Sequence, residues 1–268
     1  MSDPEPTIRI PVDVTNPGQF FACCGLLELA DRLWPGAEGW FADEHFQLSA
    51  MDASLASLSG RLQEATIVPV ADSGDPKTCP ILIKSSELSD RNEAWSMVVD
   101  WWREDGAVGG SLKTWAGQQR VFTIAAAMWH TALRSGIDSG LFNQAKLAFP
   151  PSSSKKPVAP FYFDARRFSD SLDTGFSLDV QEASVLGHPA VEILALIGLQ
   201  RFRPRLISRR KYRYSVWSTP LSPVPGSAAA ASELPLMAAY DFILVSRDNQ
   251  DRYKAFSFAT PTGDHHER

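Results

Sequence analysis

The feature that most constrains the fold is an apolar helical segment near the start of the chain. Asn16 can cap a helix, Pro17 suits the first helical position and Gln19 can close a capping box. The segment continues through FFACCGLLELADRLW and ends at Pro35. It is apolar on most faces, and such a helix has to be buried. We therefore expect this helix to lie deep in the interior.

The other patterns predict an α+β protein with a mixed or antiparallel sheet flanked by helices. We expect a helix-rich N-terminal part (1–149), a linker or long loop (150–160, PPSSSKKPVAP) and a strand-richer C-terminal part (161–268). The two parts are alternatively one integrated domain. The elements that matter below are a strand over 8–14, helices over 92–102, 118–135 and 189–200, a loop over 222–235, and a terminal hairpin over 236–246 and 252–260.

Composition narrows the class of protein. The chain has 268 residues with 44% hydrophobic and 21% charged side chains, which is ordinary for a globular protein that buries a sizeable core. No apolar run reaches the ~20 residues that span a bilayer, and the acidic N-terminus lacks the pattern of a secretory signal. The three cysteines form no disulfide framework and share no metal spacing with the five histidines. We expect a cytoplasmic protein without membrane contact, metal or cofactor.

A concentrated basic stretch lies within 201–217, RFRPRLISRRKYRYSVW, although the chain as a whole carries a formal charge of −5. No acid lies among its basic side chains, and aromatic residues alternate with them. Arginine binds phosphate in a planar fork, and aromatic faces accept unpaired bases. This composition is typical of a nucleic-acid contact surface. The basic side chains are Arg201, Arg203, Arg205, Arg209, Arg210, Lys211 and Arg213, and the rings are Phe202, Tyr212, Tyr214 and Trp217.

The same stretch has a second interpretation. From Lys211 to Trp217 polar and apolar residues alternate, as on a half-buried strand with one solvated face. Basic residues on such a strand also protect a sheet edge from pairing with another chain. The sequence alone leaves both a nucleic-acid surface and a solvated or protein-facing surface open.

Further candidate contacts lie at the start of the helix predicted over 118–135 and after the aromatic segment 161–163. A helix N-terminus offers free N–H groups to phosphate. The first site resembles a P-loop, but Leu112 stands where that motif requires glycine, so we exclude nucleotide hydrolysis there. The two glutamines alternatively cap the helix on a hydrated surface. These candidates are Lys113, Gln118, Gln119, Arg120, Arg166 and Arg167.

Three blocks carry a family resemblance that spans residues 12–260. They are NPGQFFACCGLLELA at 16–30, LKTWAGQQ at 112–119, and DTGFS at 173–177 followed by VEILALIGLQRFRP at 191–204. Together they resemble the CRISPR-associated Csb-class proteins of type I-U (I-G) systems, most closely the third, large-subunit-like member. The resemblance implies a subunit of a Cascade surveillance complex, with guide RNA, target DNA and other Cascade subunits as partners and a recruited helicase-nuclease as a further one.

We expect no catalytic centre. The sequence has neither a G-x-S-x-G elbow nor a His-Glu-x-x-His motif, and its paired carboxylates are adjacent, so they do not share a face of a regular element. The favoured function is a non-catalytic Cascade subunit that helps to bind target DNA or guide RNA. The alternatives are a protein-only scaffold and a metal-dependent nuclease whose site joins His45 or His130 to distant residues.

Overall fold

The computed structural model describes residues 5–70, 77–85, 94–103, 110–116, 118–134, 136–151, 156–167, 186–231, 238–247 and 253–262. Within them the fold is α+β, as predicted, and its three sheets are antiparallel. The helices are α1 (Pro17–Leu33), α2 (Leu55–Gln63), α3 (Val121–Arg134), α5 (Pro189–Gly198) and α6 (Pro223–Ala231), with 3-10 turns η1 (Trp101–Arg103) and η2 (Leu141–Asn143).

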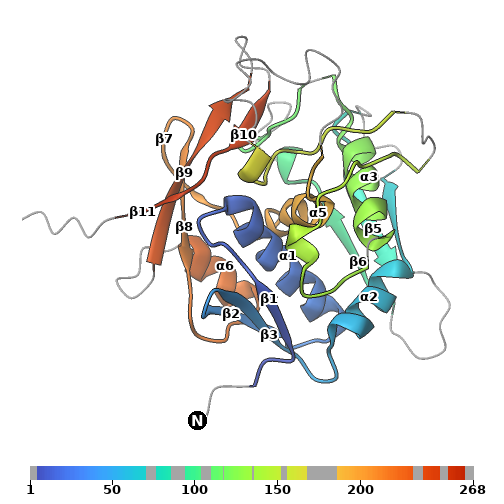
Figure 1. Cartoon of the computed structure of the whole chain (residues 1–268), viewed down its shortest axis with the longest axis vertical. Coiled ribbons are helices and arrows are strands. Elements are labelled where there is room, and N and C mark those ends of the chain that lie inside the picture. Colours follow the sequence, from blue (N-terminus) through green and yellow to red (C-terminus); the bar gives the residue numbers. More distant parts are fainter. Residues whose placement is uncertain are drawn as a thin grey trace, which may run out of the picture.

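The three sheets surround the central helices (Figure 1). The first has the order β1-β3-β2, the second β4-β5-β6, and the third β10-β9-β8-β7 with β11 also paired to β9. Their strands are β1 (Ile8–Pro11), β2 (Glu38–Ala42), β3 (His45–Ser49), β4 (Ala65–Pro69), β5 (Ile81–Ser85), β6 (Ser96–Val99), β7 (Arg205–Ser208), β8 (Lys211–Val216), β9 (Ala238–Ser246), β10 (Lys254–Phe256) and β11 (Thr260–Pro261).

Helix α1 forms the centre of the core, as its sequence predicts. Asn16 caps it by accepting a hydrogen bond from the Gly18 N–H at 3.1 Å, and Pro17 occupies its first turn. Almost every α1 side chain is buried, including Cys23 and Cys24, and burial raises the pKa of both thiols well above its usual value. Both cysteines are therefore packed core residues.

Helices α1 and α5 cross at two glycines. A Cβ atom on Gly25 would overlap the Leu194 carbonyl, and one on Gly198 would overlap the Phe21 carbonyl. The missing side chains let the two backbones approach each other closely. The crossing lies between the third sheet and the layer formed by α3 and the second sheet (Figure 1).

Two predicted elements are wrong in type. The predicted helix over 92–102 is strand β6 followed by η1 in its described part. Leu82 of β5 pairs with Val98, and this pairing prevails over the helical spacing of the apolar residues. The predicted loop over 222–235 contains α6, because Pro223 suits a helix start and the alanine run that follows has high helix propensity.

The division of the chain into a helix-rich and a strand-rich half is not confirmed. Strands β1 to β6 all lie in the N-terminal half. One continuous hydrophobic core includes residues from both halves, among them Phe20 and Phe41 together with Tyr214 and Trp217. The terminal hairpin is confirmed as β9 and β10.

Candidate nucleic-acid interface

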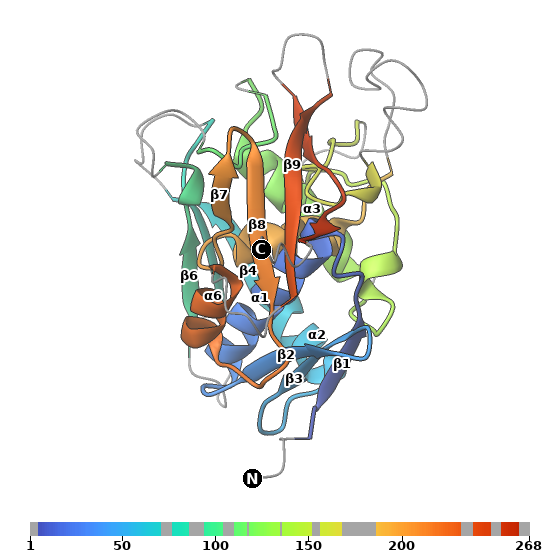
Figure 2. The same ribbon diagram turned by 90° about the vertical axis from the view of Figure 1, so that its left-hand side faces the viewer.

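The third sheet places some residues of the basic stretch on its core side and others on its solvent side. Along β8, Tyr212 and Tyr214 point into the core, whereas Lys211 and Arg213 remain partly exposed. The sheet lies at the surface of the molecule, where β7, β8 and β9 face the viewer in Figure 2. We call its solvent side the outer face, which consists of Arg205, Lys211, Arg213, Asp241 and Ile243.

The outer face keeps a positive excess around its single acid. Asp241 of β9 lies opposite Arg213, whose Nε and Nη2 donate to its carboxylate at 2.6 and 3.0 Å. Nζ of Lys211 lies 2.8 Å from the same carboxylate. Hydrogen bonds from Arg213, opposed by burial and helped by Lys211, lower the pKa of Asp241. On the other flank, Arg205 of β7 lies opposite Arg213, so two like charges are direct cross-strand neighbours.

A second group of cations lies where β7 turns into β8. We call Arg209, Arg210 and Lys254 the turn cluster. Arg209 is exposed, and Arg210 adopts a positive φ of 63° in the turn. Burial and the charge of Arg210 lower the pKa of Lys254, which indicates that the two cations are close. Like charges held together in this way favour an anionic partner.

The predicted contact Lys113 lies in a loop that packs against this end of the sheet. Oη of Tyr212 donates to the Ser111 carbonyl at 3.0 Å, and the Lys254 N–H donates to the Thr114 carbonyl at 3.0 Å. Nζ of Lys113 lies 5.6 Å from the centre of the Trp115 ring. The structure therefore brings this loop and the turn cluster together.

The aromatic residues of the basic stretch do not form a base-stacking surface. Phe202, Tyr214 and Trp217 have no exposed area, and Tyr212 is only 3% exposed. Their rings pack in the core, where Phe202 stacks on Trp217 and Tyr214 stacks on Phe20. The alternation of charge and ring along the sequence is that of a strand with one buried face.

Arg201 and Arg203 lie apart from the other residues of the basic stretch. Nε of Arg201 donates to the buried Glu28 of α1 at 2.7 Å, and this hydrogen bond raises the pKa of the guanidinium. The guanidinium of Arg203 lies 5.7 Å from the ring centre of the buried Trp101. Both residues precede β7 and contact the core instead of the outer face.

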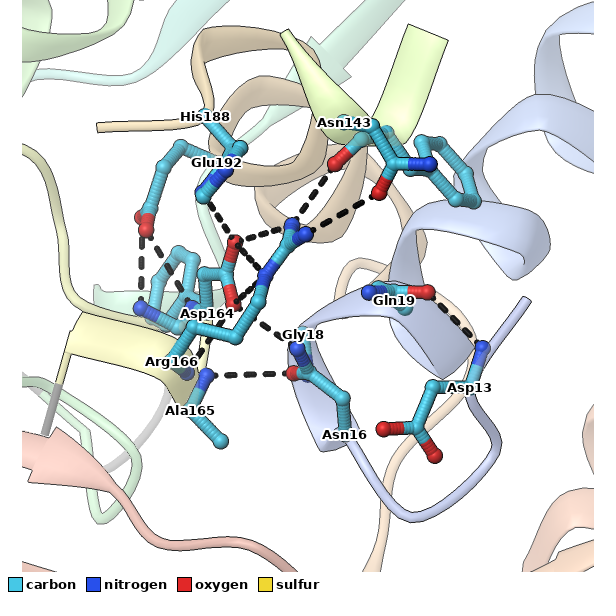
Figure 3. A network of polar contacts seen from close by, with 12 residues as sticks. Asp13, Asn16, Gly18, Gln19, Asn143, Asp164, Ala165, Arg166, His188 and Glu192 are labelled. Atoms are coloured by element: carbon cyan, nitrogen blue, oxygen red, sulfur yellow. Dashed lines mark hydrogen bonds and ion pairs between the residues drawn. The ribbon is translucent and has the colours of Figure 1, made fainter. Parts of the chain in front are cut away.

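Arg166 belongs to a buried polar network (Figure 3). Its guanidinium donates to both carboxylate oxygens of Asp164 and to the Phe142 carbonyl at 2.6 Å. Nδ1 of His188 lies 2.7 Å from Asp164 Oδ2, a contact of hydrogen-bond length. Arg167 follows Arg166 in the chain and is half-buried. Arg166 therefore pairs with the buried carboxylate of Asp164, and it is not part of the outer face.

The same network joins three distant segments of the chain. Asn16 at the start of α1 donates to Asp164 at 2.7 Å and accepts from the Ala165 N–H at 3.1 Å. The carboxylate of Glu192 in α5 accepts the N–H groups of Phe163 and Asp164, each at 3.2 Å. The position of this network beside the crossing of α1 and α5 indicates that the network has a structural role.

The two buried carboxyl groups respond to this setting in opposite directions. Burial acts to raise the pKa of Asp164, but His188 and Arg166 hold it well below its usual value. Burial and the neighbouring charge of Asp164 raise the pKa of Glu192 to about 8. Asp164 is thus an anion paired with the Arg166 guanidinium, whereas Glu192 holds its proton near neutral pH.

The start of α3 differs from the prediction. The helix begins at Val121, three residues later than predicted, because Gln119 closes a turn by accepting from the Ala116 N–H at 3.1 Å. Gln118 is exposed and accepts from Nζ of Lys77 at 2.9 Å. Arg120 is exposed, and its carbonyl accepts the first helical N–H groups. These residues form a largely exposed turn before the helix.

Two members of the site, Asp241 and Lys254, could not be identified from the sequence. Each lies in a segment that was predicted as a strand only, and their roles follow from the pairing of β9 with β8 and β10. The pairing of Arg213 with Asp241 could have been found only by fixing the register of strands that are 28 residues apart. Residues 173–177 of the third resemblance block lie outside the described residues.

In the described segments, no three His, Cys, Asp or Glu side chains are arranged to hold a metal ion. His45 contacts the Asp43 carbonyl through Nδ1 at 2.6 Å, in the tight turn between β2 and β3. Among the described helices, none combines the length and hydropathy that crossing a bilayer requires.

Comparisons with known proteins add no further constraint on this interface. No family model, curated protein or solved structure matches the chain.

Proposed function

We propose that this chain is a non-catalytic, nucleic-acid-binding subunit of a type I CRISPR surveillance complex, with the outer face and the turn cluster as its contact surface. The observation that carries the proposal is the positive excess on one side of the third sheet. Lys211 and Arg213 contact a single acid, Asp241, and Arg205 adds a further cation beside Arg213. The turn cluster extends the same charge beyond the end of the strands. The Csb-class resemblance supports the assignment to Cascade.

This surface suits phosphates better than bases. Arginine and lysine bind phosphate oxygens by charge and hydrogen bonding, and such contacts position a nucleic acid without reading its sequence. The rings that could have stacked on bases are buried instead. We therefore expect backbone contact with guide RNA or target DNA and little dependence on base sequence.

The rest of the assignment follows from the resemblance and the composition. The partners are guide RNA, target DNA and the other Cascade subunits, and the complex recruits a helicase-nuclease. The protein acts in the cytoplasm without a cofactor. An overall formal charge of −5 disfavours indiscriminate coating of DNA, so partner subunits direct the basic side to its strand.

A second candidate function is a protein-only scaffold within the same complex. Ile243 on the outer face is 47% exposed, and Leu206 on the edge strand β7 is 57% exposed. Apolar side chains of this size beside paired charges also suit a protein neighbour with acidic and apolar groups.

Crosslinking in the assembled complex separates the two candidates. A photoreactive amino acid at position 209, in the exposed turn, should crosslink to guide RNA or target DNA if the proposal holds. The double variant Arg205→Gln/Arg209→Gln should weaken target binding by the complex roughly tenfold or more, at two charge-assisted contacts. Arg9→Gln, at an exposed arginine on β1, is the matched control and should have no effect. Crosslinks to protein alone, with unchanged target binding by the double variant, would establish the scaffold.

A further inference from the structure

A small basic hollow lies at the C-terminal end of α3, away from the outer face. The last turns of the helix and the segment 146–151 enclose a volume of about 220 Å³. Two backbone bridges hold that segment in place: Lys146 exchanges both hydrogen bonds with Gly187, and the Val158 N–H donates to the Ala148 carbonyl at 2.7 Å. In Figure 1, α3 lies on the opposite side of α1 and α5 from the third sheet.

Each titratable side chain among the described residues that line this hollow is basic. Its titratable lining residues are His130 and Arg134 from the helix and Lys146 from the segment. Within the described part of the chain, none of these three side chains has a hydrogen-bond or ion-pair partner. Three basic groups without an acid contrast with the other arginines of this protein, several of which have carboxylate partners.

Stabilisation of the helix C-terminus by a cation explains only part of this arrangement. A cation in the last turn of a helix complements the partial negative charge of roughly 0.5 at the C-terminus. Arg134 is in that position and would suffice. Lys146 comes from another segment and adds a second full charge to the same hollow, which leaves a net positive charge of roughly 1.5 after the helix end is counted.

The surroundings of His130 disfavour its charged form. Burial and the nearby charge of Arg134 lower the pKa of this imidazole below its usual value. Among the described lining residues, the charged groups that face it are Arg134 from its own helix and Lys146 from the opposite segment, and none of these lining residues is a carboxylate. An anion in the hollow would reverse the effect of Arg134 and favour the imidazolium form.

We infer that this hollow binds a phosphate group, held by Arg134 and Lys146 and by His130 when that residue is protonated. Its volume lies below the ~300–1,000 Å³ that is usual for drug-sized ligands, so it suits one phosphate with its ester group. Phe149 and Pro150 supply an apolar wall for the group that the phosphate carries. The phosphate comes either from a small phosphoester or from one residue of a nucleic-acid backbone. This inference is independent of the outer face.

Sulfate is the first probe, because it stays dianionic across the range in which histidine titrates. Calorimetry should show sulfate binding to the full chain that strengthens as the pH falls from about 7.5 to about 5.5. Histidine resonances followed by NMR should show that sulfate raises the pKa of His130, assigned with His130→Gln. Arg134→Gln and Lys146→Gln should each weaken sulfate binding about tenfold. His130→Gln should remove most of the pH dependence.

Controls and a second ligand complete the test. Arg9→Gln, at an exposed arginine on β1, should leave sulfate binding unchanged, and the His130 resonance reports on the hollow apart from the proposed nucleic-acid surface. Competition by inorganic phosphate alone would assign a small phosphoester, whereas stronger competition by an oligothymidylate than by an equal concentration of phosphate would assign a nucleic-acid backbone. The inference is overturned if sulfate leaves the His130 resonance unmoved, or if Arg134→Gln and Lys146→Gln bind sulfate as the parent chain does.

Discussion

Glu192 shows how a single buried carboxyl can make the stability of the whole fold depend on pH. It has no exposed area, and it accepts two backbone N–H groups that favour its charged form. Burial and the charge of Asp164 oppose that form more strongly and raise the pKa of Glu192 to about 8. Because Asp164 itself stays charged, the two carboxyl groups of the network divide the roles of anion and neutral acid.

This pKa predicts a loss of stability as the pH rises. Between the usual glutamate value of 4.5 and about 8, the folded chain keeps a proton on Glu192 that the unfolded chain has released. The contribution of Glu192 is therefore complete below the lower value and declines as the pH approaches the upper one. We expect the free energy of unfolding to fall by on the order of a few kcal/mol between about pH 5 and about pH 8, as measured by urea denaturation.

The variant Glu192→Gln isolates this effect. It cannot ionise, so its stability should vary less with pH, although the loss of one acceptor makes it less stable than the parent chain at about pH 5. A difference between parent and variant that is constant across the pH range would show that Glu192 does not titrate in this window.

At the scale of elements, the crossing of α1 and α5 depends on two residues without side chains. Gly25→Ala places a methyl group against the Leu194 carbonyl, which belongs to the backbone of α5 and cannot move alone. The helices must separate, and overpacking of this kind costs about 1–3 kcal/mol or more. We expect Gly25→Ala to lower the free energy of unfolding by at least that amount, as measured by chemical denaturation.

Gly60→Ala is the matched control for this substitution. Gly60 lies within α2, and a methyl group there meets no atom within 4 Å. Alanine has the higher helix propensity, so this variant should gain about 0.5–1 kcal/mol. If both variants changed stability by the same amount and sign, helix propensity and not the close crossing would govern Gly25.

Elements with a local cause could be predicted from the sequence, and elements with a distant cause could not. Asn16 and Pro17 fix the start of α1, and the largely apolar run in 236–246 indicates β9. Strand β6 depends on its partner β5, which no local pattern of 92–102 reveals. The late start of α3 depends on one side chain, Gln119, which closes a turn before the helix.

At the scale of the whole molecule, the fold decides which basic residues reach the outer face. The sequence predicted one continuous contact surface along the basic stretch, because the basic residues follow one another closely. Arg201 instead contacts Glu28, which is 173 positions away. Arg166 contacts the nearby Asp164, whose carboxylate also lies close to His188 at the N-cap of α5. The part of the site that could be predicted is its location on β7 and β8. Its composition could not be predicted, because it depends on acids brought in from distant segments.

This division of the arginines predicts how binding to nucleic acid depends on salt. Each phosphate contact contributes a slope of about −0.9 to a plot of log K against log salt concentration for duplex DNA. We expect the assembled complex to lose a slope of roughly 1.5–2 when Arg205→Gln/Arg209→Gln removes two contacts, as measured by fluorescence anisotropy on a labelled duplex. Arg201→Gln should leave the slope unchanged and instead lower stability, because Glu28 loses one of its partners. An equal loss of slope in both variants would mean that Arg201 leaves Glu28 to bind phosphate. The contact surface would then include the whole basic stretch and not only the outer face with its turn cluster.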